Sequence, residues 1–252
     1  MMFDLKDKVA VVTGSSRGIG RAIAEAFARA GAKVVVSSRS REACEPVTEK
    51  LLAEGLTAMT LPCHIGRKAE LEELVSRTRE AWGEVDVLVC NAAINPAYGP
   101  LSELSDDAFD KIMATNVRST FQLCNMVLPG MAAAGGGAVI LLSSIAALRG
   151  NGVIGAYGMS KAAEAALARN LAVEWGPSKI RVNAIAPGLV RTDFARALWE
   201  DPVRLERAET RTPLRRIGEP DDIAGVALFL ASEAGAYVTG QTIVADGGEM
   251  IS

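Results

Sequence analysis

The segment Thr13-Gly14-Ser15-Ser16-Arg17-Gly18-Ile19-Gly20 stands between two stretches of different periodicity. Residues 8–13 before it are apolar and β-branched, which predicts a buried strand, and residues 21–30 after it have the apolar spacing of a helix that Gly31 closes. Because glycine has no side chain, such a turn lets a phosphate approach the backbone amides and the positive end of the helix. Glycine is also common in turns that bind nothing, but the place of this segment between a strand and a helix favours a nucleotide-binding turn.

The same alternation of strand and helix continues along the chain. Further strands are predicted at residues 32–38, 57–61, 85–90, 138–142, 180–185 and 242–245. Helices are predicted at residues 41–54, 68–82, 106–131, around Tyr157, and at 221–231. Because strands that alternate with helices form parallel sheets covered on both faces, we expect one α/β domain over residues 1–252, with a doubly wound parallel sheet of about seven strands.

Composition excludes several classes of protein. Charged residues make up 23% of the chain and apolar residues 49%, as in a compact protein with a large core. The net charge of −3 comes with no basic stripe for nucleic acid, and the apolar runs fall far short of the ~20 residues that cross a bilayer. No apolar signal core is visible near Met1. We therefore expect a soluble cytoplasmic protein that binds neither nucleic acid nor membrane.

Cysteine and histidine usage argues against metal sites and disulfides. Cys44, Cys63, Cys90 and Cys124 are far apart and form no Cys-x-x-Cys pair, which predicts buried reduced thiols. His64 is the single histidine, so no multi-histidine metal site is expected. Any catalytic chemistry is therefore expected from residues other than cysteine and histidine.

The strand at 32–38 ends in a sequence that bears on the cofactor. It runs into Ser37-Ser38-Arg39, where many NAD-binding proteins have an Asp or Glu for the ribose hydroxyls. A carboxylate there would repel a ribose 2′-phosphate, whereas Arg39, together with Arg17, can pair with one. The alternative is that Arg39 is a solvated loop residue. The sequence favours NADP(H) over NAD(H).

Other predicted strands end in small or polar residues at the same edge of the sheet. Residues 85–90 run into Asn91-Ala92-Ala93, residues 138–142 into Ser143-Ser144, and residues 180–185 into Ala186-Pro187-Gly188. Ligands of parallel sheets bind outside the carboxyl ends of the strands. We expect this edge to line the cofactor groove.

Tyr157 and Lys161 lie four residues apart in the alanine-rich run Gly155 to Ala166, so both side chains should leave the same face of a helix. A neighbouring ammonium stabilises a phenolate and lowers the pKa of a tyrosine from its usual ~10. Such a tyrosine can act as a general acid or base. An isolated Tyr-x-x-x-Lys pair is more often ordinary helix surface, so the assignment depends on the rest of the chain.

Residues 192–213 are polar, helical in pattern and interrupted by Pro202, which predicts a mobile substrate lid rather than a core element. The apolar side chains of Phe194, Leu198 and Trp199 either face a substrate or pack onto the body of the domain. Both interpretations fit the sequence.

Several separated motifs occur in one order. They are Thr13 to Gly20, Asn91-Ala92-Ala93, Asn116, Ser144, Tyr157-Gly158-Met159-Ser160-Lys161 and Pro187-Gly188. From about residue 5 to residue 248 the sequence resembles the short-chain dehydrogenase/reductase family, which has a Rossmann-like fold. It is similar to the NADPH-dependent carbonyl and retinal reductases of dehydrogenase/reductase member 4 type in five segments: Ser37-Ser38-Arg39, Cys63-His64-Ile65-Gly66, Asn91-Ala92-Ala93-Ile94-Asn95-Pro96, Arg216-Ile217-Gly218-Glu219-Pro220 and Tyr237-Val238-Thr239-Gly240.

The resemblance implies hydride transfer between nicotinamide C4 and a carbonyl carbon. Tyr157 would donate the proton to the developing alkoxide in reduction and accept it in oxidation. Lys161 would lower the pKa of Tyr157 and hold the nicotinamide ribose. Ser144 would hydrogen-bond the carbonyl oxygen, and Asn116 would position a water in the proton path. These roles agree with the chemistry, because two aimed hydroxyls stabilise charge that develops on one oxygen.

The resemblance also assigns binding residues. The expected NADP(H) site comprises Gly14, Ser16, Arg17, Gly18, Ile19, Gly20, Ser38, Arg39, His64, Ile65, Asn91, Ala92, Ala93, Tyr157, Lys161, Pro187, Gly188, Val190 and Thr192. The expected wall around a small, fairly apolar carbonyl or alcohol substrate comprises Asn95, Ile145, Leu148, Ile154, Leu189, Phe194 and Trp199. A homotetramer is implied, with the helices that begin near Asp106 and Tyr157 paired across subunits.

Two positions depart from the family pattern. His64 stands where the family commonly has an Asp near the adenine, so no acidic adenine contact is expected. The animal enzymes of the closer type carry a peroxisomal tripeptide, whereas this sequence ends Met250-Ile251-Ser252, which favours the cytoplasm.

Three alternatives stay open at this point. A 3-oxoacyl-[acyl-carrier-protein] reductase needs a basic docking surface for an acidic carrier, yet residues 119–148 contain no Lys or Arg. An NAD-linked secondary alcohol dehydrogenase would not need Arg39. A non-enzymatic dinucleotide sensor could keep the fold, since fold alone does not fix function.

Overall fold

Strand β1 (Val9–Thr13) lies inside the sheet, between β2 (Lys33–Ser37) and β4 (Val87–Cys90). The computed structural model describes residues 2–252. Every β1 residue is buried, and the side chains alternate between two layers: Ala10 and Val12 join one hydrophobic cluster and Val11 the other. A strand covered on both faces has to be apolar throughout, which explains the continuous apolar run at 8–13.

Seven parallel strands form the sheet, in the order β3-β2-β1-β4-β5-β6-β7. The remaining strands are β3 (Ala58–Thr60), β5 (Gly137–Leu142), β6 (Ile180–Pro187) and β7 (Thr242–Ala245). The strand order reverses between β1 and β4, which makes this the point where a doubly wound sheet opens a ligand crevice. The predicted fold class is confirmed.

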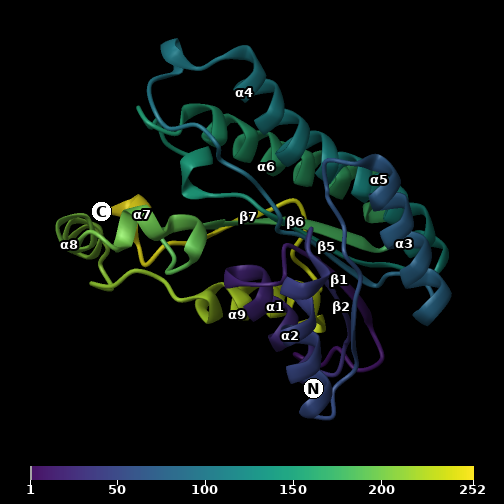
Figure 1. The fold of residues 1–252 in the computed structure, drawn as a ribbon. Helices are drawn as coiled ribbons and strands as arrows, with labels where there is room; N and C mark the ends of the chain where they lie inside the picture. The colour runs from purple at the N-terminus through teal and green to yellow at the C-terminus, as the bar shows by residue number, and fades with distance from the viewer. Residues whose placement is uncertain (1) are drawn as a thin grey trace.

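Helices cover both faces of the sheet (Figure 1). One layer consists of α1 (Gly18–Arg29), α2 (Arg41–Ala53) and α9 (Pro220–Ala231). The other consists of α3 (Lys68–Trp82), α5 (Ser119–Ala133) and α6 (Gly155–Trp175). All four cysteines are buried and free, as predicted. Among the helices of residues 2–252, none has the length and apolar character needed to cross a membrane.

The helix predicted at 106–131 is not regular. It consists of α4 (Asp106–Ile112), a π-helical turn (Met113–Arg118) and α5. Asn116 is buried within the π turn, where its side chain bonds to the chain after β4. Single π turns inside α-helices often mark functional sites, and hydrophobic periodicity does not reveal them.

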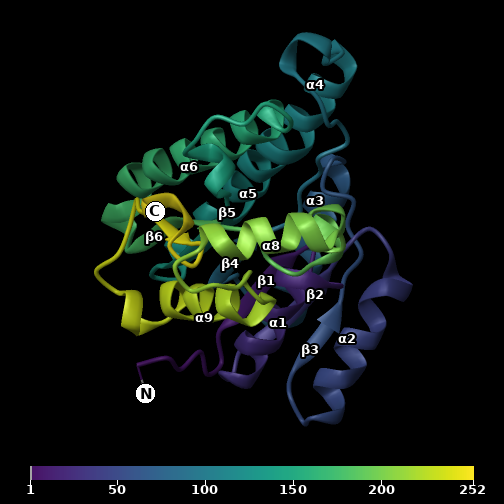
Figure 2. The same cartoon turned by 90° about the vertical axis from the view of Figure 1, so that its left-hand side faces the viewer.

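Residues 192–213 fold into three short elements, a 3₁₀ turn (Asp193–Ala195), α7 (Arg196–Trp199) and α8 (Pro202–Arg211). Pro202 begins α8 instead of interrupting a helix, and the Asp201 carboxylate caps it by accepting from the amide of Val203 at 2.9 Å. No residue of α8 is buried. Figure 2 shows α8 in front of the sheet. The mobility of this segment stays a prediction.

We expect Gly20→Ala to destabilise the domain by about 1–3 kcal/mol, because a Cβ built at Gly20 lies 2.4 Å from the Gly14 carbonyl oxygen and 2.4 Å from Asn91 Nδ2. Gly225 is the matched control. It is exposed in α9 with no atom within 4 Å of a Cβ, so Gly225→Ala should stabilise by up to about 1 kcal/mol. Denaturant unfolding measures both, and a Gly20→Ala protein as stable as the wild type would contradict the tight turn.

Candidate active site

A cavity of about 690 Å³ opens at the carboxyl ends of the central strands. It collects residues from the turns after β1, β2, β4, β5 and β6, as expected for a doubly wound sheet. The lining contains every residue that the sequence predicted for the cofactor: Gly14, Ser16, Arg17, Gly18, Ile19, Gly20, Ser38, Arg39, His64, Ile65, Asn91, Ala92, Ala93, Tyr157, Lys161, Pro187, Gly188, Val190 and Thr192.

The glycine-rich turn presents backbone amides to this cavity. Gly18, Ile19 and Gly20 form the first turn of α1, three residues earlier than the predicted helix start. No side chain caps this turn and no acid lies in it, so its free N–H groups and the positive end of the helix dipole are available to an anion. The Asn91 side chain holds the turn by donating to the Thr13 carbonyl at 2.9 Å. The residues present fit a dinucleotide pyrophosphate.

The turn after β2 offers a cation and no carboxylate. Arg39 is exposed at the cavity and has no ion-pair partner within 4.0 Å in residues 2–252. The Ser38 hydroxyl donates to the Ser40 carbonyl at 3.2 Å. Arg17 behaves differently, because its guanidinium reaches Asp193 of the 192–213 segment at 3.4 Å. Of the two arginines, Arg39 is therefore the one left for a phosphate.

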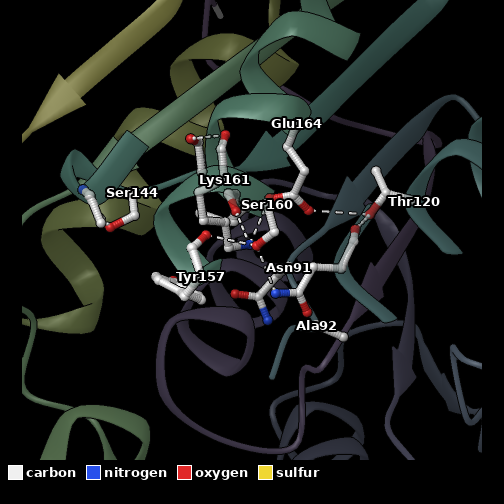
Figure 3. A network of polar contacts seen from close by, with 12 residues as sticks. Asn91, Ala92, Thr120, Ser144, Tyr157, Ser160, Lys161 and Glu164 are labelled. Carbon is white, nitrogen blue, oxygen red and sulfur yellow. Dashed lines mark hydrogen bonds and ion pairs between the residues drawn. The ribbon is translucent and has the colours of Figure 1, made fainter. Parts of the chain in front are cut away.

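Tyr157 and Lys161 leave the same face of α6, as predicted (Figure 3). Lys161 Nζ lies 5.6 Å from the centroid of the Tyr157 ring, which lines the cavity beside Phe194. The Lys161 ammonium donates to the Leu142 carbonyl at 2.6 Å and to Glu164 Oε2 at 2.7 Å. Two of its three donors are thereby used, and one remains.

Glu164 is the residue that the sequence interpretation missed. It is completely buried, and besides Lys161 it accepts from the Thr120 hydroxyl of α5 at 3.3 Å. Burial raises the pKa of Glu164, while Lys161 opposes this shift. Burial also disfavours the charge of Lys161, but Glu164, with a smaller contribution from Tyr157, opposes this effect, and the net pKa of Lys161 lies above its usual value. The pair keeps an ammonium in the interior.

The pKa of Tyr157 corrects one expectation. Burial raises it most, and Glu164 raises it further, whereas Lys161 and, to a smaller extent, the Ser144 hydroxyl lower it. Lys161 thus acts in the predicted direction, but the net pKa of Tyr157 in the free chain lies above its usual value. The phenol holds its proton at neutral pH, which suits a proton donor.

Ser144 and Asn116 occupy different positions relative to the cavity. Ser144 lines it, and its hydroxyl oxygen accepts from the Ala146 amide at 3.1 Å, which leaves the O–H free to donate. Asn116 does not line it. Its side chain donates to the Ile94 carbonyl and to the Ser160 hydroxyl, both at 3.0 Å, and so ties the chain after β4 to α6. Ser160 in turn donates to the Tyr157 carbonyl at 2.7 Å.

The apolar wall differs from the predicted one in two places. Asn95, Ile145, Ile154, Leu189 and Phe194 line the cavity, joined by Ile94, Tyr98 and Leu198. Trp199 does not line it: its indole donates to the Thr192 carbonyl at 2.9 Å, and its ring lies under Arg191. Leu148 also lies outside the lining and is exposed at the surface. Asn95 Oδ1 is buried without a partner among residues 2–252, an acceptor that a bound hydroxyl or water would satisfy.

The fold and this cavity define a dinucleotide-binding oxidoreductase. Residues 14–249 match the family model described as Enoyl-(Acyl carrier protein) reductase, and the chain belongs to the short-chain dehydrogenase/reductase family of oxidoreductases, which bind a nicotinamide cofactor. It is similar to Dehydrogenase/reductase SDR family member 4 of Bos taurus, at 44% identity over 246 residues that cover 98% of this chain and 88% of that protein. The Homo sapiens protein of that name is 41% identical over 244 residues, covering 97% and 88%.

Solved structures of dehydrogenases superpose closely on this chain. A gluconate 5-dehydrogenase from Burkholderia cenocepacia in complex with NADP and tartrate superposes with a TM-score of 0.95 at 31% identity, covering 100% of this chain and 98% of that chain. A 7α-hydroxysteroid dehydrogenase complexed with NADH and 7-oxo glycochenodeoxycholic acid gives a TM-score of 0.94 at 38% identity, covering 98% and 96%. One neighbour holds NADP and the other NADH.

Glu164→Leu should lower the free energy of unfolding by about 3–5 kcal/mol, because it leaves the Lys161 ammonium buried without its counter-ion. The double variant Lys161→Met/Glu164→Leu removes both charges and should recover most of the loss. Glu72→Leu, which breaks an exposed pair with Lys68, should change stability little. A double variant as unstable as Glu164→Leu would show that packing at residue 164, and not the charge, matters.

Proposed function

We propose that the protein is an NADP(H)-dependent reductase that converts a ketone or aldehyde to an alcohol by hydride transfer, with Tyr157 as general acid and base. The observation that carries this proposal is the meeting of three groups at one cavity: the Tyr157 phenol, the Ser144 hydroxyl and the paired Lys161 ammonium. The glycine-rich turn of the same cavity fits a dinucleotide. Nucleotide site and proton donor therefore share one compartment.

The residues divide the work as follows. The bound nicotinamide supplies the hydride. The Ser144 O–H orients the substrate by donating to the carbonyl oxygen, and the Tyr157 O–H gives its proton to that oxygen as negative charge develops there. Lys161 stabilises the phenolate that remains and uses its free donor for a ribose hydroxyl. Asn116 holds the π turn, Ile94 and Ser160 in place around this path.

Selectivity for NADP(H) is supported by Arg39 and by the lack of a carboxylate at Ser37-Ser38-Arg39. A guanidinium pairs with the ribose 2′-phosphate, whereas a carboxylate would repel it. The two solved neighbours hold different cofactors, so the preference for NADP(H) is inferred from the charge of Arg39 and not from them. An NAD-linked secondary alcohol dehydrogenase is the alternative.

A thioester substrate is a second candidate, favoured by the description of the family model. Residues 119–148, which contain no Lys or Arg, offer no docking surface for an acidic carrier protein. Acetoacetyl and crotonyl thioesters belong in the same assay as simple ketones. If the enzyme turned over these thioesters faster than the ketones, thioesters would replace ketones as the proposed substrate class.

Assembly and location are further parts of the proposal. We infer a homotetramer, supported by exposed apolar side chains on α5 and α6, namely Phe121, Met159 and Val173. A cytoplasmic location is supported by four buried free thiols.

We also infer that residues 192–213 act as a substrate lid, because the segment supplies much of the cavity wall and α8 has no buried residue.

Tyr157→Phe should lower kcat for ketone reduction by about 10²–10⁴-fold, because it removes the proton donor and keeps the ring. NADPH binding, measured by fluorescence titration, should change little. The matched control is Tyr237→Phe, which alters a fully exposed phenol. A Tyr157→Phe enzyme with wild-type kcat would reject Tyr157 as the acid.

Arg39→Asp should raise KM for NADPH about tenfold to hundredfold and leave KM for NADH nearly unchanged, because only NADPH carries the 2′-phosphate. Initial rates with both cofactors at saturating ketone measure the two values. Arg41→Asp, on the solvent side of the first turn of α2, serves as the control. Equal changes for both cofactors would contradict the assignment of Arg39.

A further inference from the structure

The cavity carries far more cationic than anionic side chains. Eight Lys and Arg residues line it against two carboxylates, although the net charge of the chain is −3. The cations are Arg17, Arg39, Lys111, Arg149, Lys161, Arg204, Arg207 and Arg211, and the carboxylates are Asp193 and Glu249. An excess of one sign in a cleft concentrates ligands of the opposite sign.

Local ion pairs account for half of these cations. The pairs are Lys161 with Glu164 at 2.7 Å, Arg17 with Asp193 at 3.4 Å, Arg149 with Glu249 at 2.5 Å and Arg204 with Asp201 at 3.5 Å. Within residues 2–252, the other four cations have no carboxylate oxygen within 4.0 Å: Arg39, Lys111, Arg207 and Arg211. These four are available to a bound anion.

Charge is segregated around α8. Arg204, Arg207 and Arg211 are spaced three and four residues apart, so they share one face of the helix, and this face lines the cavity together with Ala208. The acids of the same helix, Glu206 and Glu209, do not line it. On a solvent-exposed helix, charges of opposite sign commonly alternate along the same face. Here the cations face the cavity.

The anionic groups of a dinucleotide have other partners. The amides of the glycine-rich turn suit the pyrophosphate, and Arg39 after β2 suits the 2′-phosphate. Arg207 and Arg211 come instead from the 192–213 segment, which also contributes the apolar side chains of Phe194 and Leu198 to the wall. Part of the apolar wall and the two free guanidinium groups therefore come from the same segment of the chain.

We propose that the substrate is a carbonyl compound that also carries a carboxylate, and that Arg207 and Arg211 bind this carboxylate while the apolar wall holds the chain between the two groups. The inference rests on the proposed function and narrows its substrate class from apolar ketones to oxo acids and the corresponding hydroxy acids. A guanidinium binds a carboxylate through two parallel hydrogen bonds, which Lys cannot match. Exposed arginines on a lid also attract an anionic substrate before it is enclosed.

The test compares 7-oxooctanoate, its methyl ester and 2-octanone as substrates at saturating NADPH. We expect the wild-type enzyme to reduce the acid with the highest kcat/KM. In the double variant Arg207→Gln/Arg211→Gln, the ratio of kcat/KM for the acid to that for the ester should fall about tenfold to hundredfold, chiefly through KM for the acid. Arg77→Gln removes the same charge from α3, away from the cavity, and should keep the wild-type ratio.

Other outcomes overturn the inference. Equal reduction of acid and ester, with a ratio that the double variant does not move, would reject the carboxylate site and leave the proposed function intact. Reduction of none of the three ketones would reject the proposed function together with the inference. A rise in KM for NADPH with an unchanged ratio would assign the arginines to the cofactor. Preference for the coenzyme A thioester of the same acid, lost in the double variant, would assign them to a phosphate.

Discussion

The buried ion pair between Lys161 and Glu164 is the interaction on which the site depends. An ammonium in a protein interior is costly unless it is paired and hydrogen-bonded, and here Glu164 and the Leu142 carbonyl supply both compensations. The Lys161 carbonyl also accepts from the Ser143 hydroxyl at 2.8 Å, so one residue joins the end of β5 to α6. Through Thr120 the pair reaches α5. The cation beside Tyr157 is thereby fixed in place before any ligand arrives.

The parallel sheet explains why the remaining groups meet there. Each strand of such a sheet delivers its carboxyl end to the same edge, so Gly14, Asn91 and Ser144, which are far apart in sequence, line one cavity. Covering helices bury both faces and leave this edge as the place where polar side chains face a ligand. The 192–213 segment then completes the wall with both apolar and cationic side chains.

Sequence patterns predicted the sheet because its signals are local. Continuous apolar strands, glycine turns and alanine-rich helices are visible within short windows, and the seven strands follow from them. Glu164 was missed because a charged residue in a helix normally faces solvent, although its spacing of three residues from Lys161 was a visible signal. The π turn at Met113–Arg118 has no such signal. Trp199 and Leu148 lie outside the cavity lining, because apolar character does not tell which face of a short helix or turn meets the cavity.

The measurement that tests this account most directly is the pH dependence of kcat/KM for NADPH-dependent ketone reduction, in the wild-type enzyme and in the Lys161→Met/Glu164→Leu variant. In the proposed mechanism reduction requires protonated Tyr157, so the rate should fall as pH rises through the pKa of that phenol. Lys161 lowers this pKa more than Glu164 raises it, so removal of the pair should move the falling limb to higher pH. A limb at the same pH in both enzymes would contradict the claim that the buried pair tunes the proton donor.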